Sequence, residues 1–485
     1  MNKYLAYTPV MLAVGFFNNV KAQNYDKQID ALQNELLKMK QEMNNGSDKS
    51  KAYFKKGKGL SIKSNDGKYS FQIKGRLMYD IAAIVDAEKT VNGVSSDYSS
   101  SASNDTEGFG SEFRRIRFTL KGEVGNGWGF AFQPDFGDSP DMGSDRSVVF
   151  KDAHIYKKIK GFGKITIGNH KVAGGMYENT SSNALVFNER PMHNELMNFG
   201  NRTGIGYDTN GVFGNTFHGR ASLFSGTESA FEQGINMGDA SSTSHELYGS
   251  SVAGQYTFID EKEMKAMVGF HYGYLNLRGE ASTTGYDTAS AYINGVHTIL
   301  DKAIDLGNWD TTTPNLESFQ FYGPQALFLY KNFLLMGEYQ KGFYELEKVT
   351  GNAQEEDYDI HGWSIGGLWT ISGEQMKYSG KKGKIGGLKC KRHCTQLKFQ
   401  YQYADAVDRP SKAGVTGPFR DDGGQGRVYK GGINHYFNSN VRIMLEYAYG
   451  DYSYDDAIAE DTTNGFGENG SSEVSTVEAR LHLKW

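Results

Sequence analysis

Cysteine, proline and long apolar runs are all scarce in this sequence. Its 485 residues include 2 Cys and 8 Pro. Beyond the N-terminus no apolar stretch reaches the roughly 18 residues that a membrane-spanning helix needs, which excludes a helical membrane protein. Few prolines suit a closed sheet, where proline removes a donor from the hydrogen-bond ladder. The net charge of −5 is mild for this length and argues against nucleic acid as a partner.

Glycine and aromatic residues are abundant instead, with 60 Gly, 30 Tyr and 29 Phe. Tyr and Phe favour strands and the interfaces of membranes. From residue 59 onward, apolar and polar residues alternate in many short segments. One example is 70–81, where Phe71, Ile73 and Leu77 lie on one face and Lys74 and Arg76 on the other. A strand with one apolar face and one polar face suits a barrel that has lipid outside and water inside.

The connections between these segments alternate in length. Short turns, such as 125–127, 161–163 and 438–440, alternate with long polar stretches, such as 87–111, 225–244 and 454–472. Short turns on one side of the membrane and long loops on the other are typical of transmembrane barrels. The pattern predicts an all-β transmembrane barrel of about 16 antiparallel strands, a size that leaves an aqueous channel. The barrel should occupy residues 67–485.

The N-terminus is different in character. Residues 1–22 have a basic residue, an apolar run and a small-x-small site, and we expect a secretory signal peptide. A short N-terminal strand or helix is the alternative. Residues 23–45 have apolar residues at spacings of 3 and 4, which predicts a short coiled-coil helix in the periplasm, or else an isolated amphipathic helix. Residues 46–66 are predicted to be a linker.

The last strand alternates up to the C-terminal residue. Leu481, Leu483 and Trp485 share one face, while Arg480 and Lys484 lie on the other. An aromatic residue that ends a strand in register is typical of bacterial outer-membrane barrels, in which the assembly machinery recognises it. We therefore predict that these three residues form an assembly signal. The alternative is an ordinary closing strand of a soluble sheet.

Three segments resemble the family of phosphate-selective porins O and P. Residues 67–77 end in Gly-Arg-Leu, residues 113–122 begin with Phe-Arg-Arg, and residues 165–190 contain Thr-Ser-Ser followed by Glu-Arg. With the last strand, the resemblance spans most of residues 59–485. It implies a homotrimeric outer-membrane porin of 16 strands, whose third loop, here 171–202, folds into the lumen.

The resemblance, for Arg76, Arg114 and Arg115, and the strand alternation, for the others, suggest which residues line the channel. Basic residues suit an anion pathway, because they replace part of the hydration that an anion loses and Arg fits phosphate oxygens. The expected pore-lining residues are Lys74, Arg76, Arg114, Arg115, Arg117 and Lys121. The expected constriction-loop residues are Lys171, Glu178, Thr180, Ser181, Ser182, Asn183, Glu189 and Arg190.

Two features depart from the family's phosphate-specific members. Lysines flank the Thr-Ser-Ser core in those members, whereas Glu178 and Asn183 stand here. Strand parity also places Arg114 toward lipid, where an Arg at the midplane costs about 2–4 kcal/mol. Either a bulge turns this residue inward or it lies at the rim.

Cys390 and Cys394 leave three alternatives: a disulfide, two free thiols, or a metal site with His393. A disulfide requires that the segment turn, because an extended strand would separate the two Cα atoms by roughly 13 Å. No cofactor or metal is expected, and no catalytic motif in the right context indicates an enzyme.

The sequence thus predicts an outer-membrane porin through which small, preferentially anionic solutes such as phosphate or other oxyanions diffuse passively. Its expected partners are outer-membrane lipid, lipopolysaccharide, the barrel assembly machinery and two further copies of the chain. The alternative function is a structural tether or adhesin built on a barrel.

Overall fold

The computed structural model describes residues 34–38, 50–55, 59–91, 94–97, 109–137, 148–225, 248–276, 286–287, 290–291, 304–305, 308–309, 316–346, 358–405, 425–454 and 470–485. The predicted signal peptide lies outside these ranges, and so does most of the predicted coiled coil. Residues 34–38 are helical. Within the described ranges, no helix has the length and apolar character needed to cross a membrane.

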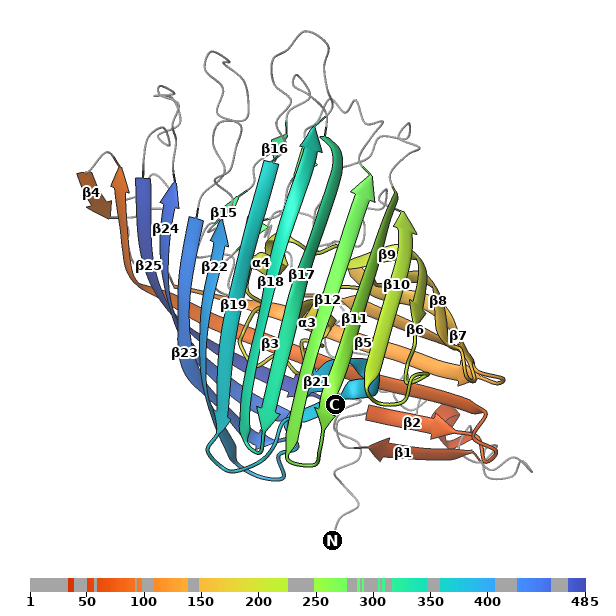
Figure 1. Cartoon of the computed structure of the whole chain (residues 1–485). Coiled ribbons are helices and arrows are strands. Elements are labelled where there is room, and N and C mark those ends of the chain that lie inside the picture. The colour runs from red at the N-terminus through yellow and green to blue at the C-terminus, as the bar shows by residue number, and fades with distance from the viewer. Residues whose placement is uncertain are drawn as a thin grey trace, which may run out of the picture.

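Sixteen antiparallel strands form one closed wall (Figure 1). They are β3 (Tyr69–Val91), β5 (Phe109–Val124), β6 (Trp128–Asp135), β7 (Val149–Ile159), β8 (Gly163–Lys171), β9 (Asn201–Asp208), β10 (Phe217–Ser225), β11 (Tyr248–Asp260), β12 (Met264–Asn276), β17 (Leu316–Tyr330), β18 (Phe333–Leu346), β19 (Tyr358–Thr370), β22 (Cys394–Asp405), β23 (Gln425–Asn438), β24 (Val441–Tyr454) and β25 (Gly470–Lys484). The wall closes where β25 pairs with β3, from Gly470 opposite Val91 to Lys484 opposite Arg76. The predicted fold class is confirmed.

The alternation in the sequence separates the two faces of the wall. In β22, Leu397 and Phe399 are exposed on the outside, whereas Gln396, Lys398 and Gln400 are buried inside. Apolar side chains can face lipid without cost, while polar ones need the hydrogen-bond partners that the interior supplies. The short turns and the C-terminus lie together at the lower end of Figure 1, here called the turn end.

A β-bulge places two consecutive arginines in the interior. Met78 of β3 pairs with Arg115 of β5, but Asp80 pairs with Glu112, so β5 has one residue more than β3 at this point. The extra residue turns the strand. The side chains of Arg114 and Arg115 are therefore both buried, at 5% and 1% exposure. Of the two alternatives for Arg114, the structure shows the bulge.

Residues 50–66, predicted as linker, contain a hairpin of β1 (Lys51–Lys55) and β2 (Gly59–Lys63). Strand β2 pairs with residues 70–73 of β3, next to the point where β25 ends. The chain thus continues the sheet beneath the barrel, because the first residues of β3 would otherwise leave one edge unpaired.

The remaining strands are not part of the sixteen-stranded wall. Strand β4 (Val94–Asp97) folds back on β3, so that β3 extends into the stretch predicted as a loop. Two small hairpins pair β13 (Tyr286–Asp287) with β16 (Asn308–Trp309) and β14 (Ser290–Ala291) with β15 (Ile304–Asp305).

Two segments fold into the interior. The first, residues 172–200 between β8 and β9, carries α3 (Met176–Asn179) and α4 (Met192–Leu196) and is called the infolded loop. The second, residues 371–393 between β19 and β22, carries β20 (Lys377–Ser379), η2 (Gly380–Lys382) and β21 (Lys384–Gly386). We call it the strap, because it reaches from its own wall at the turn end to the region of β10 and β11.

The strap is held at its tip and at its base. Near its tip, the hydroxyl groups of Tyr378 and Thr257 of β11 lie 2.8 Å apart. Gly383 has a φ of +50°, which favours glycine, and a Cβ there would lie 1.5 Å from Gln255 Oε1, at the end of that side chain. At its base, Cys390 and Cys394 form a disulfide with Cα atoms 5.8 Å apart, so the segment turns as a disulfide requires. The sequence left that pairing open.

Candidate functional site

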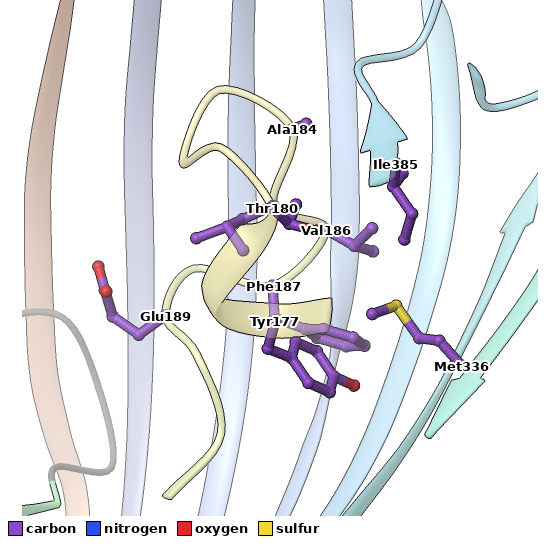
Figure 2. Close-up of a pocket in the computed structure, with 9 residues that line it drawn as sticks. Tyr177, Thr180, Ala184, Val186, Phe187, Glu189, Met336 and Ile385 are labelled. Carbon is purple, nitrogen blue, oxygen red and sulfur yellow. The ribbon is translucent and has the colours of Figure 1, made fainter. Parts of the chain in front are cut away.

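An apolar core inside the barrel joins the infolded loop, the strap and the wall. Tyr177, Val186 and Phe187 of the loop pack with Ile385 of the strap and Met336 of β18. Figure 2 shows a small cavity between these side chains, with Ile385 and Met336 pointing toward the loop. The two infolded segments therefore support each other.

Wall side chains also satisfy the backbone of the infolded loop. The amide of Tyr177 donates to Glu338 Oε2 at 3.2 Å, and the amide of Met192 donates to Gln402 Oε1 at 3.0 Å. Asn434 Nδ2 donates to the carbonyl oxygen of Val186 at 2.9 Å. Buried backbone groups need such partners, and here long polar side chains of distant strands supply them.

Glu189 is the centre of an ion-pair network in the lumen. Its carboxylate lies 3.2 Å from Arg114 Nε, 2.9 Å from Arg115 Nη2 and 2.6 Å from Arg480 Nη2. Arg480 also pairs with Asp80. These side chains are nearly inaccessible to solvent. The bulge in β5 and the last strand thus supply three guanidinium groups to one carboxylate of the infolded loop.

Glu178, which stands where the phosphate-specific porins have a lysine, is also paired. It contacts Lys171, and its Oε2 lies 3.3 Å from Arg190 Nε. Burial alone would raise the pKa of Glu178, but Arg190 and Lys171 lower it to about 2. Its negative charge is therefore balanced locally.

Three cations near the tip of the infolded loop have no such carboxylate. Within the described part of the chain, Arg76, Arg442 and Lys484 form no ion pair with Asp or Glu. We call them the tip cluster. The guanidinium of Arg76 donates to the hydroxyl of Ser182, and a Cβ on Gly387 of the strap would lie 3.3 Å from Lys484 Nζ.

A histidine connects this cluster to the loop. Arg442 Nε donates to His482 Nδ1 at 2.9 Å, and His482 Nε2 lies 3.0 Å from Asn183 Oδ1. Because Nδ1 accepts a hydrogen bond from Arg442, the proton of the neutral ring is on Nε2, which donates to Asn183. The neutral ring therefore does not offset the positive charges of the tip cluster.

The structure brings most of the predicted residues into the lumen. Arg117 pairs with Asp135, and Lys121 lies beside Lys74. In the loop, the Thr180 hydroxyl donates to the carbonyl oxygen of Met176 at 2.8 Å, while Ser181 is exposed. Leu481 and Leu483 face outward, and the ring of Trp485 lies 5.8 Å from that of Phe118. The site thus divides into paired cations, such as Arg115, and unpaired ones, such as Arg76.

Sequence reasoning missed Arg442 and the partners of the loop, although the alternation places Arg442 on the inner face of its strand. It also missed the strap, whose short strands β20 and β21 have three residues each. No cluster of three or more His, Cys, Asp or Glu suited to a metal ion occurs among the described residues.

Glu195 of α4 predicts a pH dependence. Burial raises the pKa of Glu195 to about 7, with Arg190 and Arg114 opposing the shift and Glu189 and Glu178 adding to it. As pH falls through this value, the lumen loses one negative charge, so anion preference should increase between about pH 8 and pH 6. Reversal potentials across a salt gradient would measure this change. Glu195→Gln should reduce the increase in anion preference on acidification. If the variant and the unmodified porin showed the same pH profile, the assignment to Glu195 would be wrong.

The family comparison decides the identity. A model of the family described as phosphate-selective porin O and P matches residues 89–483. The chain belongs to this family. The protein is therefore an outer-membrane porin, and its closed wall of sixteen strands is that of a passive diffusion channel.

Solved porin structures share the general shape of this porin at low identity. The anion-selective porin from Comamonas acidovorans is 14% identical, covers 86% of this chain and 100% of its own, and has a TM-score of 0.48. The outer membrane channel DcaP of Acinetobacter baumannii is 11% identical, covers 87% and 99%, and has a TM-score of 0.49. Neither likeness bears on function.

A curated relative matches over a shorter stretch. An uncharacterized protein of Caulobacter vibrioides is 29% identical over 141 residues, which is 29% of this chain. The chain spans about a quarter of the length of that relative, since the match covers 24% of it.

Proposed function

We propose that this porin passes small solutes with a weak preference for anions, and that the tip cluster carries the preference. The single observation behind this proposal is the charge balance of the lumen. Carboxylates offset Arg114, Arg115, Arg117 and Arg480, whereas no described carboxylate pairs with Arg76, Arg442 or Lys484. An unpaired cation in a narrow, partly dry space attracts mobile anions.

The preference should be weak and should depend on salt. Mobile ions in the channel screen a charge beyond about 8–10 Å at physiological ionic strength, and beyond about 3 Å at 1 M salt. The tip cluster therefore favours anions electrostatically and does not strip them of their hydration. Its action should fade as the salt concentration rises, which distinguishes it from a tight dehydrating filter.

Reversal potentials in planar bilayers test this proposal. Replacing all three residues, as Arg76→Gln, Arg442→Gln and Lys484→Gln, should move the reversal potential in a KCl gradient toward cation preference. A control with Lys68→Gln and Lys160→Gln changes two exposed turn residues and should leave the potential unchanged. Cation preference in the unmodified porin would refute the assignment of anions. Anion preference that survives the triple replacement would show that other residues carry it.

The assembly of the porin is a further part of the proposal. We infer a homotrimer in contact with lipopolysaccharide, inserted by the barrel assembly machinery through Leu481, Leu483 and Trp485. Residues 1–22 would be removed as a signal peptide, and 23–45 would form a periplasmic coiled coil. The family membership and the heptad spacing support this arrangement. Light scattering of gently extracted porin would measure the number of chains, and a monomer would contradict the proposal.

A further inference from the structure

Two histidine rings meet on the outer face of the wall at the turn end. Nδ1 of His393 lies 3.5 Å from Nε2 of His435, and the ring centroids are 5.7 Å apart. His435 alternates along β23 with the buried Asn434 and Tyr436, so its ring lies on the outer face of that strand. His393, the last residue of the strap, is exposed, and His435 is half-buried. An ion in the surrounding water can therefore reach both nitrogens.

The gap between the two nitrogens fits one metal ion. Zinc binds imidazole nitrogen at about 2.0–2.1 Å in tetrahedral geometry, which sets two such nitrogens about 3.4 Å apart. The observed separation of 3.5 Å is close to that value. An ion with the same bond length in square-planar geometry would need the nitrogens about 2.9 Å apart. Since imidazole is a good ligand for several transition metals, the spacing is what favours zinc among them.

Thr395 orients the ring of His435 for this role. Thr395 lies directly opposite His435 in the sheet, and its hydroxyl oxygen is 3.0 Å from His435 Nδ1. The amide of Thr395 donates to Ser372 Oγ at 3.1 Å, which fixes its own backbone. A hydroxyl that accepts from Nδ1 leaves the lone pair of Nε2 free for a metal, and metal-binding histidines commonly hold their second nitrogen in this way.

The disulfide positions the other ring. His393 lies within the loop closed by Cys390 and Cys394, both of which are buried. Ser439 Oγ donates to the carbonyl oxygen of Cys390 at 2.6 Å, and the amide of His393 donates to that of Phe437 at 3.4 Å. His393 has a φ of +49°, which is uncommon for a residue with a side chain. The closed loop therefore holds the ring beside β23 before any ion binds, which lowers the entropic cost of binding.

We propose that His393 and His435 form a zinc site at the periplasmic rim of the wall, and that the bound ion fastens the base of the strap to β23. Short turns face the periplasm in bacterial barrels, so zinc in that compartment reaches the pair. Two protein ligands are fewer than structural or catalytic zinc sites have, so water completes the coordination and the ion exchanges with the medium. The site is separate from the tip cluster and does not depend on the anion preference.

Three cations in or next to the disulfide loop oppose a divalent ion. Lys389, Lys391 and Arg392 are exposed, so mobile ions screen their charge beyond about 10 Å at 0.1 M salt and beyond about 3 Å at 1 M. The affinity for zinc should therefore rise with salt concentration, whereas an ion held by surface carboxylates would be released. Titrations with zinc nitrate at low and high sodium nitrate measure this dependence. A lower affinity at high salt would indicate carboxylate ligands and overturn the assignment.

Calorimetric titration of the detergent-extracted porin with zinc nitrate tests the site, with a purification tag that contains no histidine. The unmodified porin should bind one zinc ion per chain, and X-ray absorption should show imidazole nitrogens at about 2.0–2.1 Å. His393→Gln and His435→Gln should each abolish binding. The matched control, His361→Gln, removes a ring opposite Asp405 at the other end of the wall and should keep it. Thr395→Val should lower the affinity about 10–100-fold, as the loss of an orienting partner does.

Reduction of the disulfide tests the fastening. Zinc should slow cleavage of the Cys390–Cys394 bond by a phosphine in the unmodified porin, and it should have no effect in His435→Gln. If that variant does not assemble, the exposed His393→Gln gives the same comparison.

The contrary outcomes are distinct. An unmodified porin that binds no zinc, or histidine variants that bind it as the control does, would overturn the site. Equal cleavage rates with and without zinc in the unmodified porin would overturn the fastening. The proposed function is measured separately by reversal potentials, so its failure would leave the zinc site standing and the reverse also holds.

Discussion

Replacing Glu189 by Gln should strongly disturb both the position of the infolded loop and the selectivity of the porin. The substitution keeps the shape of the side chain but removes the one carboxylate shared by Arg114, Arg115 and Arg480. Breaking a buried ion pair by neutralising one partner typically costs about 3–5 kcal/mol, because it leaves buried charge uncompensated. We expect a lower thermal midpoint, noisier single-channel currents and a shift of the reversal potential toward anions.

Glu123→Gln is the matched control for this experiment. Glu123 pairs with Lys158 in a half-exposed position at the turn end, and such surface pairs contribute little. The control should therefore leave the thermal midpoint and the reversal potential nearly unchanged. If Glu189→Gln behaved like Glu123→Gln, the network around Glu189 would not be what holds the loop.

Deleting Trp485 should sharply lower the amount of folded porin in the outer membrane. The main chain of Trp485 exchanges two hydrogen bonds with Gly75, at 3.1 and 3.2 Å. Its ring covers Gly75, where an added Cβ would lie 2.2 Å from the ring, and meets the ring of Phe118 edge-on. Deletion removes these contacts at the seam where β25 closes on β3, together with the proposed assembly signal.

A quantitative immunoblot of outer-membrane fractions measures this effect. Trp485→Phe keeps an aromatic ring and both backbone hydrogen bonds, so this variant should retain most of the folded porin. Gly75→Val should reproduce the defect from the other side of the seam, because its side chain would collide with the indole ring. Normal levels of the deletion variant would show that the terminal residue is dispensable.

Local pattern in the sequence predicted the architecture. Successive side chains of a strand point to opposite faces, so the alternation within each segment predicts which side chains face the interior. Gln396 inside and Leu397 outside are an example. The same argument applied to each segment predicts the number of strands and the position of the last one. Residues 165–190, through their resemblance to the family, also indicated which connection folds inward.

The two-residue alternation predicted the wrong face of the wall where a strand is irregular. Arg114 faces the lumen because β5 contains one residue more than its partner, and a bulge has no signature in a two-residue period. The sequence did not predict the β1–β2 hairpin, for a related reason. Its strands of five residues lie in a lysine-rich stretch, and they form only because the end of β3 offers a free edge.

The charge balance of the channel is decided by tertiary structure alone. Glu189 and Arg480 are 291 residues apart and meet only because the barrel closes and the loop folds inward. For the same reason the sequence could not show that Glu178 is neutralised while Arg442 is not. The two-residue period of a strand specifies which side of the wall a charge occupies. Which charges face each other across the lumen depends on closure of the wall and on the path of the infolded loop and the strap, and neither is encoded in any local pattern.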